Sequence, residues 1–465
     1  MKKWFFLLLI SISFKGYTQA DSTTTFTFSS FLKIVRIHHP MALQSRLQTK
    51  IGAANLLKAR GGFDPKIQGD IAQKYFENKE YYDLGEGKLK VPTWFGIEFE
   101  AGYERNQGQF LNPENNIPTA GLWFAGISVP LGEGLFIDER RAELRKAQIM
   151  IKQTDAEREL IFNELLYSAG IAYWDWFMAY HNLQVYQNAL VLAQQRFDAV
   201  KQGAFLGDTP SIDTLEASIQ LQNRILNLEQ ALLDYKNSTA FLSIYLWQEG
   251  VIPMELKEDI LPERREEIEN RFFQQKSKAE MDSLLKNHPE LRKSVAKIDQ
   301  LEIEKRWLRE QLKPKLNLKY NPITEVTENN VLAEYSINNY TWGLQLEFPI
   351  FLRKERGKLN LIKLKAGENQ LSLQNKQEVL AYKIQSAVNE LETTKNQITV
   401  YRKTTVDYKG LLNGEKRLFD GGESSLFMVN SRELGFINAQ IKLVELLTKN
   451  QKAKLKLGYA LGNLN

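Results

Sequence analysis

The chain has 465 residues, of which 43% are hydrophobic, 25% are charged and none is cysteine. The lack of cysteine excludes disulfide scaffolds, cysteine zinc sites, iron–sulfur clusters and cysteine nucleophiles. The hydrophobic content is ample for a buried core, and the mean hydropathy of -0.38 excludes a protein built of membrane-spanning helices. The formal net charge of +5 raises the question of a nucleic-acid partner.

The N-terminus has the layout of a secretory signal peptide. Two lysines precede an apolar run over residues 4–14, and a polar stretch follows that ends in Thr18 and Ala20. Small residues at these two positions favour cleavage after Ala20. The apolar run is too short for a transmembrane helix, which needs roughly 17 to 25 residues. We therefore expect residues 1–20 to be a signal peptide.

Cleavage would change the charge of the chain. It removes three lysines and no acidic residue, so 61 basic residues become 58 against 56 acidic ones, and the net charge falls from +5 to +2. Nucleic acid is therefore not an expected partner. No cysteine follows the cleavage site, so no lipid anchor is expected. No later segment is apolar for long enough to be a membrane helix, which leaves an exported soluble protein or one that crosses a membrane as β-strands.

Residues that recur at fixed spacing predict an internal duplication. One set recurs after 249 residues and a second set after 219 residues, so the first copy contains an insertion of 30 residues between Pro65 and Trp123. We divide the chain into a first repeat (21–247), a linker (248–288) and a second repeat (289–465). The equivalent pairs are His39 and His288, Pro40 and Pro289, Arg60 and Arg309, Pro65 and Pro314, Lys66 and Lys315, Trp123 and Trp342, Pro130 and Pro349, Ala147 and Ala366, and Gly203 and Gly422.

Each repeat begins with a helix, over residues 40–60 and 289–312, that starts after a His-Pro pair. Because proline suits the first turn of a helix, we interpret His39 and His288 as parts of helix-start turns. A metal or catalytic role would need further ligands or a paired base at suitable spacing, and the sequence offers none. We therefore expect no metal and no cofactor.

Strands with alternating polar and apolar residues follow in each repeat. The second repeat offers two strands, around residues 316–320 and 342–348, and the first offers three candidates. We expect the insertion, residues 77–119, to form an extended extracellular hairpin or long loop, and we leave open which candidates line a barrel. The candidates in the first repeat are 65–76, 93–105 and 121–131; the polar positions are Asn317, Lys319, Gln345, Glu347, Glu98, Glu100 and Glu104, and the aromatic positions expected to face lipid are Trp94, Trp123, Trp342 and Phe348.

Two proline-free segments, over about 137–202 and 355–420, predict very long helices, since 66 residues make a rod of roughly 100 Å. Each is followed by a turn, at 203–210 and at 421–423, and by a returning helix, over about 211–246 and 424–457. Because each repeat leaves a helix and returns to one, its number of membrane crossings is even. We expect four strands per chain, whose open edges must be closed by further copies of the chain. Two copies would give a barrel filled by its own side chains, whereas three would give twelve strands and a lumen.

The order of these elements resembles the TolC family of outer membrane factors. The resemblance rests on "VPLGEGLFIDERRAELRKA" (129–147), "FPIFLRKERGKLNL" (348–361) and "RLFDGGESSLFMVNSRE" (417–433) in their order and spacing. It implies an α+β membrane protein: a homotrimer with a twelve-stranded outer-membrane barrel and a periplasmic tunnel of coiled helices. The implied function is a passive export duct in a tripartite efflux pump or type I secretion system. The implied partners are a periplasmic adaptor protein and an inner-membrane RND or ABC transporter.

The resemblance also implies roles for residues at the helix tips. The two tips would contact the adaptor, and a pair of aspartates in the second tip of TolC-like proteins rings the entrance to the tunnel. Here those two places hold Met428 and Ser431, so we expect the acidic gate residues in the first tip instead, at Asp213 and Glu216. Helix capping remains an alternative role for them. The expected adaptor contacts are Gly203, Thr209, Ser211, Gly422, Glu423, Ser424 and Ser425.

Two other functions remain as alternatives. An exported coiled-coil structural or adhesive protein would explain the long helices but not the alternating aromatic strands. An enzyme is not expected, because no nucleophile has a paired base and no Walker loop is present.

Overall fold

The computed structural model describes residues 24–207, 210–257, 259–269, 277–325 and 336–464. The expected signal peptide, residues 1–20, lies outside these ranges. The chain divides into two compact units, and three long helices contribute residues to both. Unit 1 consists of 1–39, 169–273 and 393–452, and unit 2 consists of 40–168, 274–392 and 453–465.

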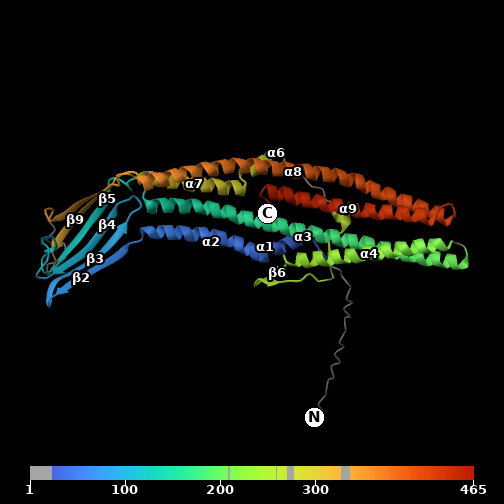
Figure 1. Cartoon of the computed structure of the whole chain (residues 1–465), viewed down its shortest axis with the longest axis horizontal. Helices are drawn as coiled ribbons and strands as arrows, with labels where there is room; N and C mark the ends of the chain where they lie inside the picture. Colours follow the sequence, from blue (N-terminus) through green and yellow to red (C-terminus); the bar gives the residue numbers. More distant parts are fainter. Residues whose placement is uncertain (1–23, 208–209, 258, 270–276, 326–335, 465) are drawn as a thin grey trace, which may run out of the picture. The chain divides into compact units, whose positions relative to one another are not determined.

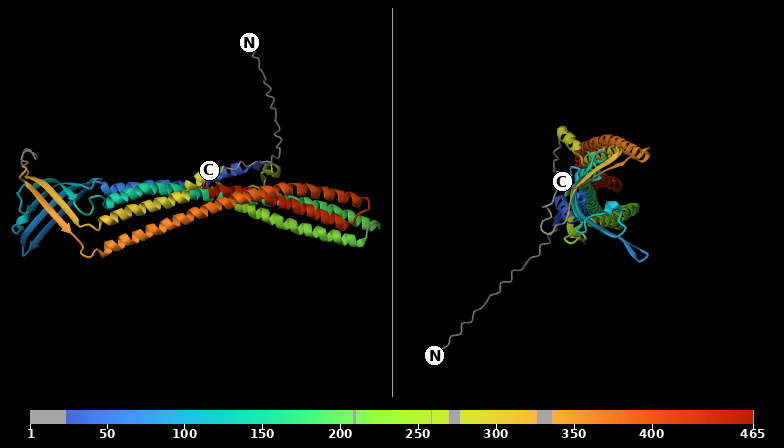
Figure 2. Two further views of the ribbon diagram at one scale, coloured as in Figure 1. Left: turned by 90° about the horizontal axis from the view of Figure 1, so that it is seen from above. Right: turned by 90° about the vertical axis from the view of Figure 1, so that its left-hand side faces the viewer.

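Unit 2 contains a curled six-stranded sheet (Figures 1 and 2). Neighbouring strands are antiparallel, and the order across the sheet is β10-β9-β5-β4-β3-β2. Of these six strands, the first and the last along the chain are therefore the two outer ones. The strands are β2 (Lys66–Phe76), β3 (Lys79–Pro92), β4 (Glu98–Gln107), β5 (Leu122–Pro130), β9 (Lys315–Glu325) and β10 (Tyr340–Glu347).

The sheet has six strands, two more than the four expected per chain, because residues 77–119, expected to form an extended extracellular hairpin or long loop, supply two of them. Strands β3 and β4 both lie within residues 77–119 and occupy the interior of the sheet, between β2 and β5. The candidate strand 93–105 begins at Glu98, since residues 93–97 form a turn in which Gly96 has a φ of 95°. Residues 108–121 form the loop between β4 and β5 and include the short 3-10 helix η2 (Pro113–Asn115).

Helices of unit 2 extend from the sheet, each entered or left through one strand. Helix α2 (Pro40–Arg60) leads through η1 (Gly61–Phe63) into β2, and α7 (Pro289–Glu310) leads into β9. Strands β5 and β10 lead into α3 (Glu139–Leu206) and α8 (Arg353–Asp420), each 68 residues long. Apolar side chains at helical spacing join α7 to α8 through a cluster of Leu301, Leu308, Leu359 and Ile362.

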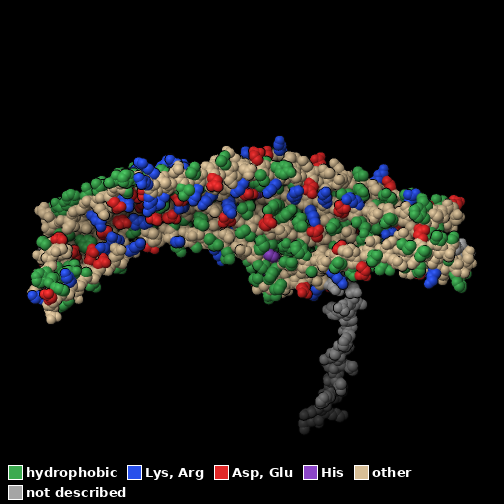
Figure 3. All heavy atoms as spheres, viewed as in Figure 1, with side chains coloured by type: hydrophobic (Ala, Val, Ile, Leu, Met, Phe, Trp, Pro, Cys, Tyr) green, Lys and Arg blue, Asp and Glu red, His purple; other side chains and the backbone are tan. Residues whose placement is uncertain are grey.

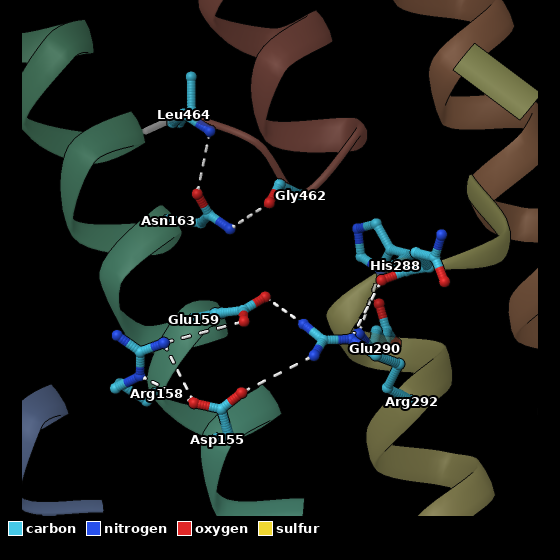
Figure 4. A network of polar contacts seen from close by, with 10 residues as sticks. Asp155, Arg158, Glu159, Asn163, His288, Glu290, Arg292, Gly462 and Leu464 are labelled. Carbon is cyan, nitrogen blue, oxygen red and sulfur yellow. Dashed lines mark hydrogen bonds and ion pairs between the residues drawn. The ribbon is translucent and has the colours of Figure 1, made fainter. Parts of the chain in front are cut away.

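The polar contacts in Figure 4 attach α7 and the C-terminal tail to α3. Arg292 binds Glu159, and its Nη1 lies 3.8 Å from Asp155. Asn163, which is 3% exposed, donates to the Gly462 carbonyl at 2.8 Å and accepts from the Leu464 N–H at 3.1 Å. The Asn163 side chain therefore holds the tail through one backbone carbonyl and one backbone N–H.

The two His-Pro pairs lie at helix boundaries, as expected. The N-cap of α7 is His288, whose Nδ1 accepts from the Glu290 N–H at 3.1 Å. Burial lowers the pKa of this imidazole, and the neutral ring is the form that accepts a hydrogen bond. His39 caps the end of the preceding helix, and α2 begins at Pro40.

Unit 1 packs helices around an aromatic core. Tyr173, Trp174, Trp176 and Phe177 on α3 are each at most 1% exposed, and Phe31 is fully buried against Tyr173. The expected linker, residues 248–288, contributes short strands and α5 to this unit, and α6 (Lys278–Lys286) to unit 2. The further elements of unit 1 are β1 (Thr24–Phe26), α1 (Phe28–His38), α4 (Ser211–Ser243), β6 (Trp247–Gln248), β7 (Ile252–Pro253), β8 (Ile260–Pro262) and α5 (Arg265–Glu269), together with most of α9 (Leu426–Ala460).

The long helices agree with the proline-free segments to within four residues at each end. The first ends at Leu206 rather than at residue 202, so Gly203 lies inside the last turn of α3 and not in the connection. Among the described residues, no helix combines the length and the apolar composition needed to cross a bilayer.

Candidate functional surfaces: the sheet and the helix tips

One face of the sheet is charged. Because side chains alternate along a strand, the observed register places all the polar positions expected from the sequence on this face. Its centre is Glu100, 6% exposed, whose Oε1 lies 3.3 Å from Lys90 Nζ and 3.8 Å from Lys319 Nζ. The two lysines belong to β3 and β9, so ion pairs extend over most of the width of the sheet. Figure 3 shows acidic and basic side chains gathered over this part of the molecule.

The opposite face is apolar on all six strands, and most of its large side chains are exposed in the single chain. The exposed fraction is 87% for Ile67 on β2 and 64% for Trp342 on β10. A water-soluble monomer rarely leaves so continuous an apolar surface uncovered. Its large side chains are Ile67, Ile71, Leu89, Phe99, Tyr103, Trp123, Ile127, Leu318, Tyr320, Tyr340, Trp342, Leu344 and Leu346.

A closely packed turn joins the sheet to α3. Asp138 caps this helix by accepting from the Arg141 backbone N–H at 2.8 Å and from its Nε at 3.1 Å. The guanidinium of Arg141 also donates to the carbonyls of Leu135 and Gly134. A Cβ on Gly132 would lie 2.0 Å from the Pro314 carbonyl oxygen, so only glycine fits beside the start of β9. These contacts explain much of the motif at 129–147.

The second helix tip, in unit 1, is a Schellman turn followed by a capped helix. Gly422 has a φ of 78°; its N–H donates to the Phe419 carbonyl, and the Glu423 N–H donates to the Leu418 carbonyl at 2.8 Å. Ser425 then caps α9, with its Oγ accepting from the Met428 N–H at 3.4 Å. Ser424 binds Glu415, a carboxylate that also lies 3.4 Å from Arg432 Nε.

The first tip has less internal support. Helix α3 ends before Gly207, which has a φ of 85°, and Pro210 at the start of α4 supplies no side-chain cap. Thr209 lies outside the described residues. Large apolar side chains are exposed here, with Phe205 at 90% and Ile212 at 71%. The first tip is therefore an apolar surface that none of the described residues covers.

Buried charges connect the two tips within unit 1; we call Arg196, Glu216, Arg224, Asn430 and Glu433 the tip clasp. Arg196 on α3 binds Glu433, which is 2% exposed, and donates to the Asn430 amide oxygen at 2.7 Å. The Asn430 amide nitrogen donates to Glu216 on α4 at 3.0 Å. Arg224 is 4% exposed, and burial lowers its pKa. Half-buried Arg196 and buried Arg224 therefore both face the buried carboxylate of Glu433.

Of the expected gate residues, the structure brings only Glu216 into a side-chain contact with the other tip. Among the described residues, Asp213 makes no side-chain hydrogen bond or ion pair, and its backbone N–H donates to the Pro210 carbonyl at 3.1 Å. Met428 is half-buried and Ser431 is exposed. Ser211, Gly422 and Glu423 are exposed, as an adaptor-contact role requires.

Four residues of the tip clasp were not predicted from the sequence, because they lie one or more helical turns away from the tip glycines: Arg196, Arg224, Asn430 and Glu433. Glu433 carries a detectable signal. The residues three and four positions away on its helix are Val429, Asn430, Phe436 and Ile437, so the carboxylate stands on the apolar stripe of α9. A charge at such a position predicts a buried partner on another element.

Three solved outer membrane proteins share the fold of the chain. The Campylobacter jejuni CmeC outer membrane channel is 15% identical, with a TM-score of 0.65 over 93% of this chain and 85% of its own. The Neisseria gonorrhoeae MtrE outer membrane channel, in its open state, is 14% identical, with a TM-score of 0.67 over 93% and 88%. The outer membrane protein VceC of Vibrio cholerae is 12% identical, with a TM-score of 0.65 over 94% and 96%. At these identities the likeness establishes the fold.

A family model matches part of the second half of the sequence. The model of the outer membrane efflux protein family matches residues 281–463, whereas comparison with curated protein sequences gives no match. That family consists of channels and not of enzymes, which confirms the prediction that the chain is not an enzyme. Its fold and this match together confirm the resemblance to TolC-like outer membrane factors, with the family match covering residues 281–463 of the chain.

Proposed function

We propose that the chain is the passive export duct of a tripartite efflux pump or type I secretion system, located in the outer membrane with a periplasmic helical extension. The observation that carries this proposal is the two-faced sheet. An antiparallel sheet with an exposed apolar face and an ion-paired opposite face suits a wall between lipid and water. Trp123 and Trp342 lie on the apolar face, where aromatic side chains favour lipid headgroups, and Phe348, 49% exposed, directly follows β10.

The proposed assembly is a homotrimer. A sheet with open edges cannot stand alone in lipid, because its unpaired backbone groups have no partner there. Copies of the chain can supply the missing pairing, and three copies would leave a water-filled lumen. The internal duplication proposed from the sequence fits such an assembly, since each chain would then present two similar wall segments.

The proposed partners are a periplasmic adaptor protein and an inner-membrane RND or ABC transporter, which would supply the energy for transport. The exposed apolar residues of the first tip and the rigid turn of the second form the proposed adaptor contact. Ser211 and Ser425 lie at the starts of the two returning helices and are both exposed, so photo-crosslinkers placed there should capture the adaptor. Capture of no adaptor at either position would exclude the tips as its docking site.

The alternative of an exported coiled-coil adhesive protein does not account for the sheet. A planar bilayer experiment separates the two functions. The purified chain should migrate as a heat-modifiable oligomer from the outer-membrane fraction and conduct ions when reconstituted into a bilayer. An adhesive rod would show neither property.

The gate is proposed to involve Asp213 and Glu216 from each chain of the trimer. Threefold symmetry would bring these carboxylates into a ring near the axis. Replacing both by alanine should increase channel conductance and change antibiotic sensitivity. Wild-type values in both assays would remove Asp213 and Glu216 from the gate.

A further inference from the structure

We infer that all six strands belong to the channel wall, and that β10 of one chain pairs with β2 of the next copy in a defined register. The inference rests on the proposed function, because it concerns how the wall closes. Every residue of β2 and of β10 is exposed in the single chain. Within the described residues, no strand pairs with the outer edge of either one. These two edges are therefore the places where a further copy can add.

The side chains of β2 and β3 place this hairpin in the wall rather than beside it. Its apolar face continues that of the other four strands, with Ile71 86% exposed and Leu89 40% exposed. Its charged face is equally continuous, since Lys88 lies 4.0 Å from Asp70 and Lys90 bonds Glu100 on β4. A hairpin standing in water beside the wall would expose the first surface and interrupt the second.

The strand directions allow the joint. Neighbouring strands alternate in direction across the six, so the two outer strands of one sheet run in opposite directions. When the β10 edge of one chain meets the β2 edge of the next, the pairing is therefore antiparallel. Strand β2 has 11 residues and β10 has 8, which permits a joint along most of their length.

The junction between β5 and β9 supplies the register. It joins the last strand of the proposed first repeat to the first strand of the second, as β10 and β2 of the next copy would be joined. Its observed pairs include Ser128 with Lys319 and Ile127 with Tyr320. Transferred by the two offsets found in the sequence, 219 and 249, these pairs become Glu347 with Asp70 and Leu346 with Ile71. The second pair lies on the apolar face in both strands, as alternation requires.

The facing carboxylates of Asp70 and Glu347 each have a lysine on the neighbouring strand of their own chain. Lys88 Nζ lies 4.0 Å from Asp70, and Lys315 Nζ lies 3.6 Å from Glu347. The joint would thus continue the row of charges across the boundary between chains. In a trimer the wall would have eighteen strands rather than twelve. Because barrel diameter grows roughly linearly with strand number, the barrel would be about 1.5 times as wide.

Disulfide mapping tests the joint, and a chain without cysteine gives no background. The variant Asp70→Cys/Glu347→Cys should form covalent dimers and trimers when outer membranes are oxidised, and reduction should reverse them. The matched control is Glu104→Cys/Glu347→Cys. Glu104 lies level with Asp70 through the pairs Asp70–Glu86 and Glu86–Glu104, but on β4. The control variant should remain monomeric in denaturing gels, as should each single variant.

Crosslinking of the control pair would overturn the inference, because it would place β4 at the chain boundary and the β2–β3 hairpin outside the wall. Absence of crosslinking in a variant that still forms the native oligomer would also overturn it. Strand counting in a cryo-EM map of the unmodified channel gives the same decision without substitutions: eighteen strands support the joint, and twelve exclude it. Failure of the unmodified chain to oligomerise or conduct would instead overturn the proposed function.

Discussion

Removal of the charge on Glu433 should open the tip clasp. In Glu433→Gln the amide keeps the shape of the side chain but leaves Arg196 and Arg224 without a carboxylate between them. Glu433 is 2% exposed and Arg224 4%, so water cannot replace the missing charge in the closed structure. Breaking a buried ion pair from one side costs about 3–5 kcal/mol. Even about 3 kcal/mol changes an opening equilibrium by roughly 100-fold.

Hydrogen–deuterium exchange measures this equilibrium residue by residue. The backbone amides of the first turns of α4 and α9 should exchange roughly 100-fold faster in Glu433→Gln, whereas those of α7 should be unchanged. The matched control is Glu445→Gln on the same helix. Its carboxylate lies 2.9 Å from Lys442 but is 48% exposed, and such pairs contribute about 0–1 kcal/mol.

Equal exchange in Glu433→Gln and Glu445→Gln would refute the reasoning, since it would mean that the burial of the clasp has no energetic effect. A second readout connects the clasp to transport. If the tips move when the channel opens, Glu433→Gln should raise the fraction of time that single channels conduct in a planar bilayer. Faster exchange with unchanged conductance would retain the energetic argument and separate the clasp from the gate.

Three further predictions concern other parts of the chain. Gly132→Ala should destabilise the sheet junction by about 1–3 kcal/mol in denaturant unfolding, because its Cβ would lie 2.0 Å from the Pro314 carbonyl; Gly357→Ala, with open space around its Cβ, should be neutral or stabilising. Burial is the chief cause that lowers the pKa of His181 from its ordinary value of 6.5. The folded state therefore loses stability as the pH falls below about 6.5, by at most about 1.4 kcal/mol per pH unit. His181→Gln should remove that part of the pH dependence of stability, and an unchanged slope of stability against pH would contradict the prediction. Asn163→Ala should free the C-terminal tail for carboxypeptidase digestion by removing both of its hydrogen bonds. Asn369→Ala should leave digestion unchanged, because that side chain bonds the Lys365 carbonyl of its own helix.

The elements with strong local signals were predictable. Residues 139–206 and 353–420 contain no proline and are rich in helix formers, so local preference and the final helices agree. Strand β10 alternates between Trp342, Leu344 and Leu346 and small or polar residues, and the structure keeps this alternation as two faces. In both cases the information lies within the segment itself.

Strand β3 and the tip clasp were not predictable in the same way. One face of β3 carries Gly85 and Gly87, so alternation disappears over the middle of the strand, and pairing with β2 and β4 determines its conformation. The clasp depends on contacts between residues more than 200 positions apart, such as Arg196 and Glu433. The spacing of residues within one helix does not show which of its many charged side chains will contact a charged side chain on another helix.

The sheet has two strands more than expected, although the argument that each repeat contributes an even number of strands applies to both numbers. A chain segment that leaves a helix and returns to one at the same end of a sheet must contain an even number of strands, and this holds equally for two and for four. The 30 residues inserted into the proposed first repeat can form two strands of about ten residues with their turns, which is one complete hairpin. With a single added strand, the chain would leave the sheet at the opposite end, away from the start of α3. Insertion of a whole hairpin is therefore the smallest enlargement of the wall that leaves the entry into the long helix unchanged, and β3 with β4 is what the structure contains.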